Sequence, residues 1–130
     1  MSQENVEIVR RAFAYEIHGV GDRAEAEAIF DPQVVMNPSD EKPSYGFEAM
    51  RSDYVRWASA FEGLSVTIEE IIDAGDQVLV VAHHEGRGRR SGVQVDTRFY
   101  EVYTVREGKV SRVDEFTERA EALEAAGLSD

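Results

Sequence analysis

The chain has 130 residues, of which 42% are hydrophobic and 31% are charged, a balance typical of one globular domain with a single core. Acidic residues outnumber basic ones by 26 to 14, and the formal net charge of −12 disfavours nucleic acids and anionic membrane surfaces as partners. The chain contains no cysteine, which excludes disulfides, thiolate metal sites and cysteine nucleophiles.

The first part of the chain carries the period of amphipathic helices. Ser2, followed by acidic residues, marks a helix start, and apolar residues at helical spacing continue to Ile17. Gly19 and Gly21 are predicted to end this helix. A second, shorter helix is predicted from Asp22 to Phe30.

A short strand, Val34–Met36, comes next and is stopped by Asn37-Pro38. The polar stretch Ser39–Tyr45 is predicted to be a loop. A longer helix then begins at Gly46, and the apolar face of this helix consists of Met50, Tyr54, Trp57 and Phe61.

Beyond Gly63 the period changes to that of strands. Four long strands are expected, at Leu64–Ala74, Gln77–Arg87, Val93–Arg106 and Lys109–Thr117. Short turn sequences join them, which predicts an antiparallel meander. A short helix from Glu118 to Ala126 follows. Helices first and strands later indicate one α+β domain over residues 1–130, with a cavity between the helices and a twisted sheet.

Several local strings carry a resemblance to a known family. They are ENVEIVRRAF at 4–13, IFDP at 29–32, YG at 45–46, IDAGD at 72–76 and REGKV at 106–110. With the element order, they resemble the SnoaL-like (polyketide cyclase and ketosteroid isomerase-like) branch of the nuclear transport factor 2-like superfamily. The resemblance implies a cone-shaped, barrel-like roll of cystatin type. Three N-terminal helices would cover the concave face of a strongly bent antiparallel sheet, with a short C-terminal helix added.

The resemblance does not imply one activity, because the superfamily contains isomerases, cyclases, dehydratases, hydrolases and pocket proteins without known chemistry. In ketosteroid isomerases the carboxylate after the first short strand is the general base, and that position falls on Asn37. An amide cannot take up a proton at neutral pH, so steroid isomerisation by that mechanism is not expected. The oxyanion-hole tyrosine falls near Ala12, with Tyr15 one turn later. Asn37 and Tyr15 are kept as expected hydrogen-bond donors to a substrate.

The acid on the third long strand of those isomerases has a counterpart in Glu101. Strand alternation places Glu101 on one face with Phe99 and Tyr103. On an aromatic face, desolvation raises the pKa of a carboxyl group and keeps it neutral enough to donate a hydrogen bond. The alternative is that Glu101 points outward, since a slip of one residue in register exchanges the two faces.

Glu115 matches the position at which SnoaL-type polyketide cyclases carry an acid/base aspartate. The alternative is an exposed charge, because a Glu115 that faced inward would leave the ring of Phe116 on the outer face, over a subunit interface or under the terminal helix. His83 and His84 are adjacent, so one faces the pocket and the other faces away. The resemblance places His83 on the pocket face, where it would serve as base or acid or stay a half-buried histidine without a role.

No metal and no cofactor are expected. A metal cluster of His83, Glu101 and Glu115 lacks any helical or paired ligand spacing. The helices are expected to complete the pocket with Asp53, Tyr54 and Trp57, although the two aromatic residues also suit plain core packing. Glu16 lies in the apolar stripe of the first helix, but we expect its carboxylate to reach solvent near the helix end.

Three classes of function stay open on this basis. The first is a cofactor-free isomerase, cyclase or dehydratase that uses Glu101, Glu115 and His83 for proton transfer on a small apolar carbonyl compound. The second is a non-catalytic binding domain for a small apolar molecule in the cone. The third is a homodimeric interaction domain, whose outer sheet face presents Tyr100, Val102 and Phe116. The first residues lack a signal-peptide pattern and no apolar run is long enough to span a membrane, so a cytoplasmic location is expected.

Overall fold

The computed structural model describes residues 2–128 and has the mixed α+β composition that the sequence predicts. The elements follow one another as α1 (Ser2–His18), α2 (Arg23–Ile29), β1 (Phe30–Asn37), β2 (Ser44–Tyr45), α3 (Phe47–Ala58), β3 (Phe61–Ala74), β4 (Gln77–Gly88), β5 (Gln94–Arg106), β6 (Lys109–Phe116) and α4 (Arg119–Ala125). The four long strands lie within three residues of their predicted bounds. The predicted loop contains one addition, the two-residue strand β2, which pairs with β1.

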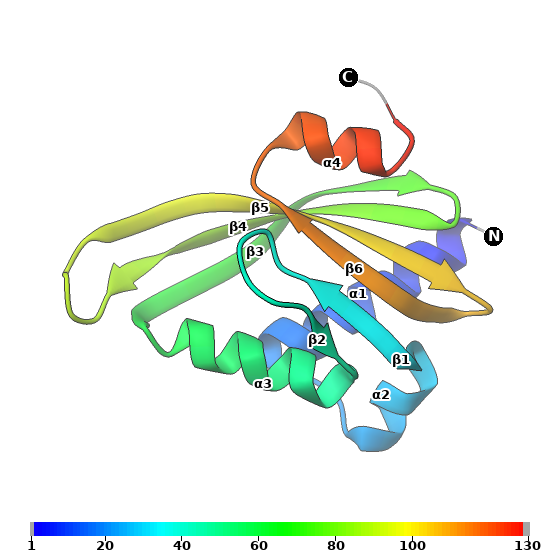
Figure 1. The fold of residues 1–130 in the computed structure, drawn as a ribbon, viewed down its shortest axis with the longest axis horizontal. Coiled ribbons are helices and arrows are strands. Elements are labelled where there is room, and N and C mark those ends of the chain that lie inside the picture. The colour runs from blue at the N-terminus through cyan, green and yellow to red at the C-terminus, as the bar shows by residue number, and fades with distance from the viewer. Residues whose placement is uncertain (1, 129–130) are drawn as a thin grey trace.

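Six strands form one curved, unclosed sheet in the order β2-β1-β6-β5-β4-β3. Helices α1 to α3 lie on one side of this sheet and α4 on the other (Figure 1). The four long strands form the expected antiparallel meander, and β1 joins it by running parallel to β6. Parallel pairing needs a long connection, and the whole meander between β1 and β6 supplies it.

The sheet has a core on each face, and this decides where the strand residues point. Val78, Val80 and Ala82 of β4 pack into the larger core with α1 to α3. Their neighbours Leu79 and Val81 pack on the opposite face, in the smaller core beneath α4. Both sets are buried, so the sequence of β4 is continuously apolar from Val78 to Ala82 and does not alternate between apolar and polar residues there.

The outer face is covered by the chain's own terminal helix. Tyr100, Val102 and Phe116, which were expected to hold a second copy of the chain, pack in the same cluster as Ala122 and Ala126 of α4. Val102 is fully buried there. The expected dimer surface is therefore occupied within one chain, and a homodimer stays a prediction that light scattering can test. No helix among the described residues is long and apolar enough to cross a membrane.

Asp22 caps α2 with a complete capping box, because its side chain accepts a hydrogen bond from the Glu25 backbone N–H and the Glu25 side chain accepts one from the Asp22 N–H. We expect Asp22→Ala to lower the free energy of unfolding by about 1 kcal/mol, the usual loss for an N-cap, measured by urea denaturation. Glu27→Ala is the control. It removes only an exposed ion pair with Arg23 and should change stability by a few tenths of that amount. Equal effects of the two substitutions would contradict the capping assignment.

Candidate functional site

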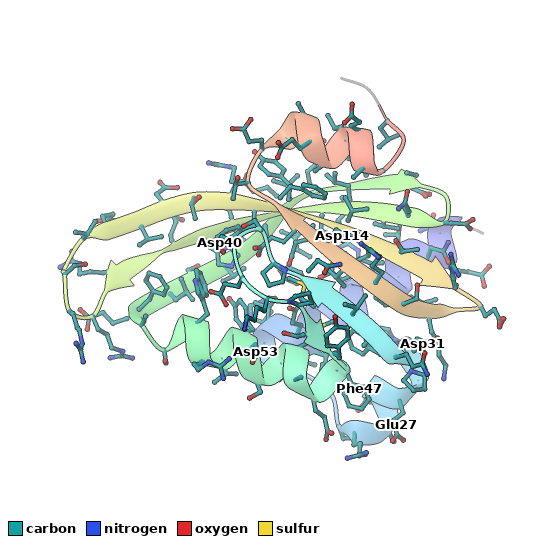
Figure 2. The ribbon with its side chains drawn as sticks, viewed as in Figure 1. Glu27, Asp31, Asp40, Phe47, Asp53 and Asp114 are labelled. Carbon is teal, nitrogen blue, oxygen red and sulfur yellow. The ribbon has the colours of Figure 1, made fainter. Side chains whose placement is uncertain are left out.

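A cavity of about 150 Å³ lies between the concave face of the sheet and helices α1 and α3. A cavity of this size in another protein holds a molecule as large as benzene. Its walls are Glu16, Ile17, Met36, Pro38, Ser39, Asp40, Glu41, Ser44, Met50, Asp53, Tyr54, Trp57, His84, Phe99, Glu101, Glu115 and Thr117. Asp40 comes from the loop after β1 and Asp53 from α3 (Figure 2).

Strand pairing brings two carboxyl groups together in the cavity. Glu101 of β5 stands directly opposite Glu115 of β6 in the antiparallel ladder, so both side chains share the concave face. Glu101 also pairs with Val80 of β4, which packs in the larger core. The structure thus places both predicted acids in the cavity wall, together with Phe99.

Glu16 of α1 is a third carboxyl group in the same wall. Its side chain is only 2% exposed, and that of Glu101 only 3%. One oxygen of each group, Oε1, has no hydrogen-bond partner among the described residues. The expectation that Glu16 reaches solvent is wrong. Glu16 shares the apolar stripe of α1 with Val9 and Phe13, and this position was the sequence signal for its burial. The stripe packs against the sheet, so the carboxyl group of Glu16 is buried with it.

Burial shifts the protonation of these groups toward the neutral form. Desolvation, with repulsion from Glu115, raises the pKa of Glu16 to about 8, and the charge of Arg51 only partly opposes it. Desolvation, followed by repulsion from Glu16 and Glu115, raises the pKa of Glu101 well above its ordinary value. Glu16 is therefore mainly protonated at neutral pH, and burial favours the neutral form of Glu101 in the same way, so both groups are suited to donate a hydrogen bond.

Glu115 differs from the other two because the loop after β1 stabilises its ionised form. Its Oε1 accepts hydrogen bonds from the Ser39 backbone N–H at 3.0 Å and from the Ser39 hydroxyl at 3.2 Å. Desolvation raises the pKa of Glu115 above its ordinary value, and the two bonds from Ser39 oppose this rise only in part. Of the three carboxyl groups, Glu115 is the one held most readily as a carboxylate.

An aromatic cluster lines the same cavity beside the carboxyl groups. Trp57 and Phe99 have ring centroids 5.9 Å apart at an angle of 80°, and His84 meets Phe99 edge-on at 4.9 Å. The Tyr54 hydroxyl lies 3.4 Å from Nε2 of His84, and Nδ1 of His84 lies 3.4 Å from the Ala82 carbonyl. Desolvation lowers the pKa of His84 to about 4, so the ring is neutral. A proton on Nδ1 then leaves Nε2 to accept from Tyr54.

The charge in the cavity is all of one sign. Six of the lining residues are acidic, and none of the described lining residues is lysine or arginine. Asp53 at the edge accepts hydrogen bonds from Ser44 and from Arg56, which lower its pKa. Arg51 lies nearby, but it donates to the backbone carbonyls of Glu16 and Ile17 at the end of α1.

His83 does not face the cavity, which corrects the assignment made from the sequence. It lies on the outer face of β4, where Nε2 is 2.6 Å from Asp96 and Nδ1 is 3.4 Å from Glu69. His84 takes the inner position instead. The pattern Leu79-Val81-His83 could not decide between the faces, because α4 buries the outer face of β4 as well.

A metal cluster of His83 with Glu101 and Glu115, which the sequence did not favour, does not form, since His83 is on the opposite face of the sheet. His83, Glu85 and Asp96 do place their ligand atoms within 4.8 Å of one another. Both ring nitrogens of His83 already contact carboxylates, and one of these, Glu69, is also paired with Arg98 at 2.6 Å. These contacts account for the cluster as surface ion pairs.

Two expected hydrogen-bond donors lie outside the cavity. Tyr15 packs its ring against Phe30 and Phe47, at centroid distances of 5.7 and 5.8 Å, in the core between the helices and β1. Asn37 faces away from the cavity and donates to Asp114 at 2.9 Å across the parallel β1–β6 pair. The sequence could not show this pairing, and alternation along β1 then puts Met36 inside in place of Asn37.

Tyr103 lies beneath the cavity wall and not in it. Its side chain is fully buried, and its hydroxyl has no hydrogen-bond partner among the described residues. Burial, and then the nearby carboxyl groups of Glu101, Glu16 and Glu115, raises its pKa well above the ordinary value. Asp53, Tyr54, Trp57 and Phe99 line the cavity as expected.

Comparison with known proteins identifies a matching sequence family and solved structures of the same fold. The sequence model of the SnoaL-like domain matches residues 9–113. A candidate SnoaL-like polyketide cyclase from Jannaschia sp. CCS1 is 23% identical, with a TM-score of 0.75 over 98% of this chain and 94% of that one. No curated protein sequence matches the chain significantly.

Two further solved structures of this fold hold small molecules. A protein of ketosteroid isomerase-like fold from Catenulispora acidiphila DSM 44928, in complex with trimethylamine, is 20% identical, with a TM-score of 0.68 over 94% of this chain and 93% of that one. TerC, co-crystallised with polyporic acid, is 18% identical, with a TM-score of 0.69 over 95% of this chain and 98% of that one. At these identities the likeness shows the fold alone.

Proposed function

The chain belongs to the SnoaL-like domain family, and we propose that its cavity binds a small carbonyl compound and moves a proton on it without a cofactor. The observation that carries the proposal is the unequal state of three carboxyl groups in one cavity. Glu115 is stabilised as a carboxylate by Ser39, whereas Glu16 and Glu101 are buried and protonated, each with an unpartnered oxygen. Carboxyl groups whose environments push their pKa values apart are suited to act as base and acid. The small molecules in the Catenulispora and TerC structures support the choice of ligand size.

In the proposed step Glu115 removes a proton from the carbon next to the carbonyl group. The C–H electron pair forms a C=C bond, and the C=O π pair moves to the oxygen. That oxygen accepts a hydrogen bond from protonated Glu101 or Glu16, which stabilises the developing negative charge in a site largely closed to water. When protonated Glu115 trades its proton with solvent before returning one to the same carbon, the result is exchange. Return of a proton to another carbon of an unsaturated carbonyl compound gives isomerisation.

The aromatic wall positions the substrate. Trp57 and Phe99 offer flat apolar surfaces, and neutral His84 fixes the Tyr54 hydroxyl by accepting its hydrogen bond. Because His84 is held neutral, it adds no positive charge that would attract an anionic substrate. The acidic lining residues that are ionised repel anions as well, so phosphate and carboxylate compounds are disfavoured.

Solvent exchange tests this function without knowledge of the natural substrate. The protein is incubated in D₂O with a panel of small ketones, such as cyclohexanone and 2-cyclohexenone, and deuterium at the α carbon is followed by NMR. We expect incorporation faster than in protein-free buffer at the same pH, rising with pH as Glu115 ionises. Equal rates with and without protein across the panel would contradict proton transfer on simple ketones. Ligand-induced shifts in melting temperature without exchange would instead favour the binding-domain alternative.

A further inference from the structure

We propose that the compound bound in this cavity carries a small organic cation, a quaternary ammonium or protonated amino group, held between the Trp57–Phe99 wall and the carboxyl groups of Glu16 and Glu101. The inference rests on the proposed function in one respect, because it narrows the class of carbonyl compound that the same cavity accepts. It replaces the purely apolar substrate expected from the sequence.

The first argument is that two buried carboxyl oxygens lack hydrogen-bond partners among the described residues. Glu16 and Glu101 are almost completely buried, and each has an Oε1 atom that no described residue contacts by a hydrogen bond. An unpaired buried polar group is costly, and pairing with a cation offsets that cost. Arg51 does not pair with these oxygens, since its Nη1 donates to two backbone carbonyls of α1.

The second argument is the aromatic cluster that lines the cavity beside the carboxyl groups. Tyr54, Trp57 and Phe99 surround this part of the cavity with aromatic rings. Ring faces attract cations, and rings combined with carboxylates are the usual recognition elements for alkylated ammonium groups. Alkylated ammonium groups also suit the geometry, because their methyl groups pack on rings and need no hydrogen-bond acceptors.

The third argument is that binding and ionisation are coupled. A bound cation favours the ionised form of the carboxyl group that it contacts, so its binding releases a proton, and affinity rises with pH while the free group is still protonated. The other carboxyl group of the pair stays protonated, because Glu16 and Glu101 repel each other when both are charged, and it still donates to the carbonyl oxygen. The other titratable or charged groups that face them are Arg51 and Tyr54 from α3, His84 from β4, Tyr103 from β5 and Glu115 from β6. Of these, only Arg51 carries a positive charge between pH 6.5 and 8.5, and its side chain is fixed on α1.

Calorimetric titration with choline and with 3,3-dimethylbutan-1-ol tests the inference. The two compounds have the same shape, but only choline is charged, and its charge does not depend on pH. We expect choline to bind at least roughly tenfold more tightly than the alcohol at pH 8.5, with a smaller ratio at pH 6.5. We also expect the complex to release protons, seen as heats that depend on the ionisation enthalpy of the buffer.

Variants distinguish a specific choline site from nonspecific electrostatic attraction of choline to an acidic protein. Glu101→Gln and Trp57→Leu should each weaken choline binding by about tenfold, while alcohol binding changes less. Glu69→Gln is the matched control, since it removes one negative charge from the outer face and should leave choline affinity within a factor of two. Equal affinities of choline and the alcohol, or equal losses in Glu101→Gln and Glu69→Gln, would overturn the inference.

The experiments distinguish failure of the cation site from failure of the proposed proton transfer. Deuterium exchange into neutral ketones with no preference for choline would keep the proposed function and overturn the cation. Choline binding with no exchange into any ketone would keep the cation site and overturn catalysis on those ketones.

Discussion

Raising the pH from about 6.5 to 8 is expected to lower the unfolding free energy of this protein, and Glu16→Gln is expected to remove a large part of that loss. The ordinary pKa of a glutamate carboxyl is 4.5, and burial raises that of Glu16 to about 8. Between these values the folded state binds a proton that the unfolded state has lost, so stability falls as pH rises. The slope is about 1.4 kcal/mol per pH unit for each such group, and Glu101 contributes in the same direction.

His84 opposes this slope over a lower pH range. Its pKa falls from 6.5 to about 4, so the unfolded state binds the extra proton between those values and stability rises with pH there. Below pH 6.5 the histidine and glutamate contributions partly cancel. Above 6.5 only the buried carboxyl groups act, which makes the fall steepest between 6.5 and 8.

Urea denaturation at half-unit steps from pH 5 to 9 measures this profile. In Glu16→Gln the carboxyl is replaced by a neutral group of the same shape, so the variant should be more stable than the wild type at pH 8.5 by a few kcal/mol and similar to it at pH 5. Glu48→Gln, an exposed glutamate on α3, is the control and should leave the profile unchanged. A wild-type profile that is flat above pH 6.5 would mean that Glu16 is not a buried carboxyl group.

Glu115→Gln is expected to slow the proposed α-proton exchange by roughly 10²- to 10⁴-fold, the usual contribution of a positioned general base. The amide keeps the size of the side chain and can still contact Ser39, but it cannot accept a proton. The initial rate of deuterium incorporation into the best ketone of the panel measures the effect. Tyr15→Phe is the control, because Tyr15 packs on Phe30 and Phe47 outside the cavity and its hydroxyl should not matter.

Ser39→Ala tests the role of Glu115 as the base by changing the pKa of Glu115. The Ser39 hydroxyl stabilises the ionised form of Glu115, so its removal should raise the pKa of Glu115. The rising limb of exchange against pH should then move to higher pH, with the plateau rate nearly unchanged. A lower plateau at an unchanged midpoint would assign Ser39 to substrate binding and contradict its role in setting the pKa of Glu115.

The predicted elements that agree with the structure are those that depend on residues close together in the chain. The helical stripe of α1, the span of α2 and the short turns between the long strands are local patterns, and each lies where it was expected. Glu101 was also placed in the cavity from local alternation, because it shares a strand face with Phe99. Asp53, Tyr54 and Trp57 followed from the apolar face of α3.

What tertiary structure decided were the contacts between segments far apart in the chain. The choice of His84 over His83 depends on α4, because that helix buries the outer face of β4 and so makes both faces apolar. The parallel pairing of β1 with β6 turns Asn37 toward Asp114, and the packing of α1 against the sheet encloses Glu16. The sequence by itself predicted the family, the long elements and, with an outward-facing alternative left open for each, two of the three cavity carboxyl groups. Packing of α1 against the sheet placed the third carboxyl group, that of Glu16, in the cavity wall, and it left no lysine or arginine among the described lining residues. Burial and the direction in which a side chain points depend on how the layers pack together and not on any one segment.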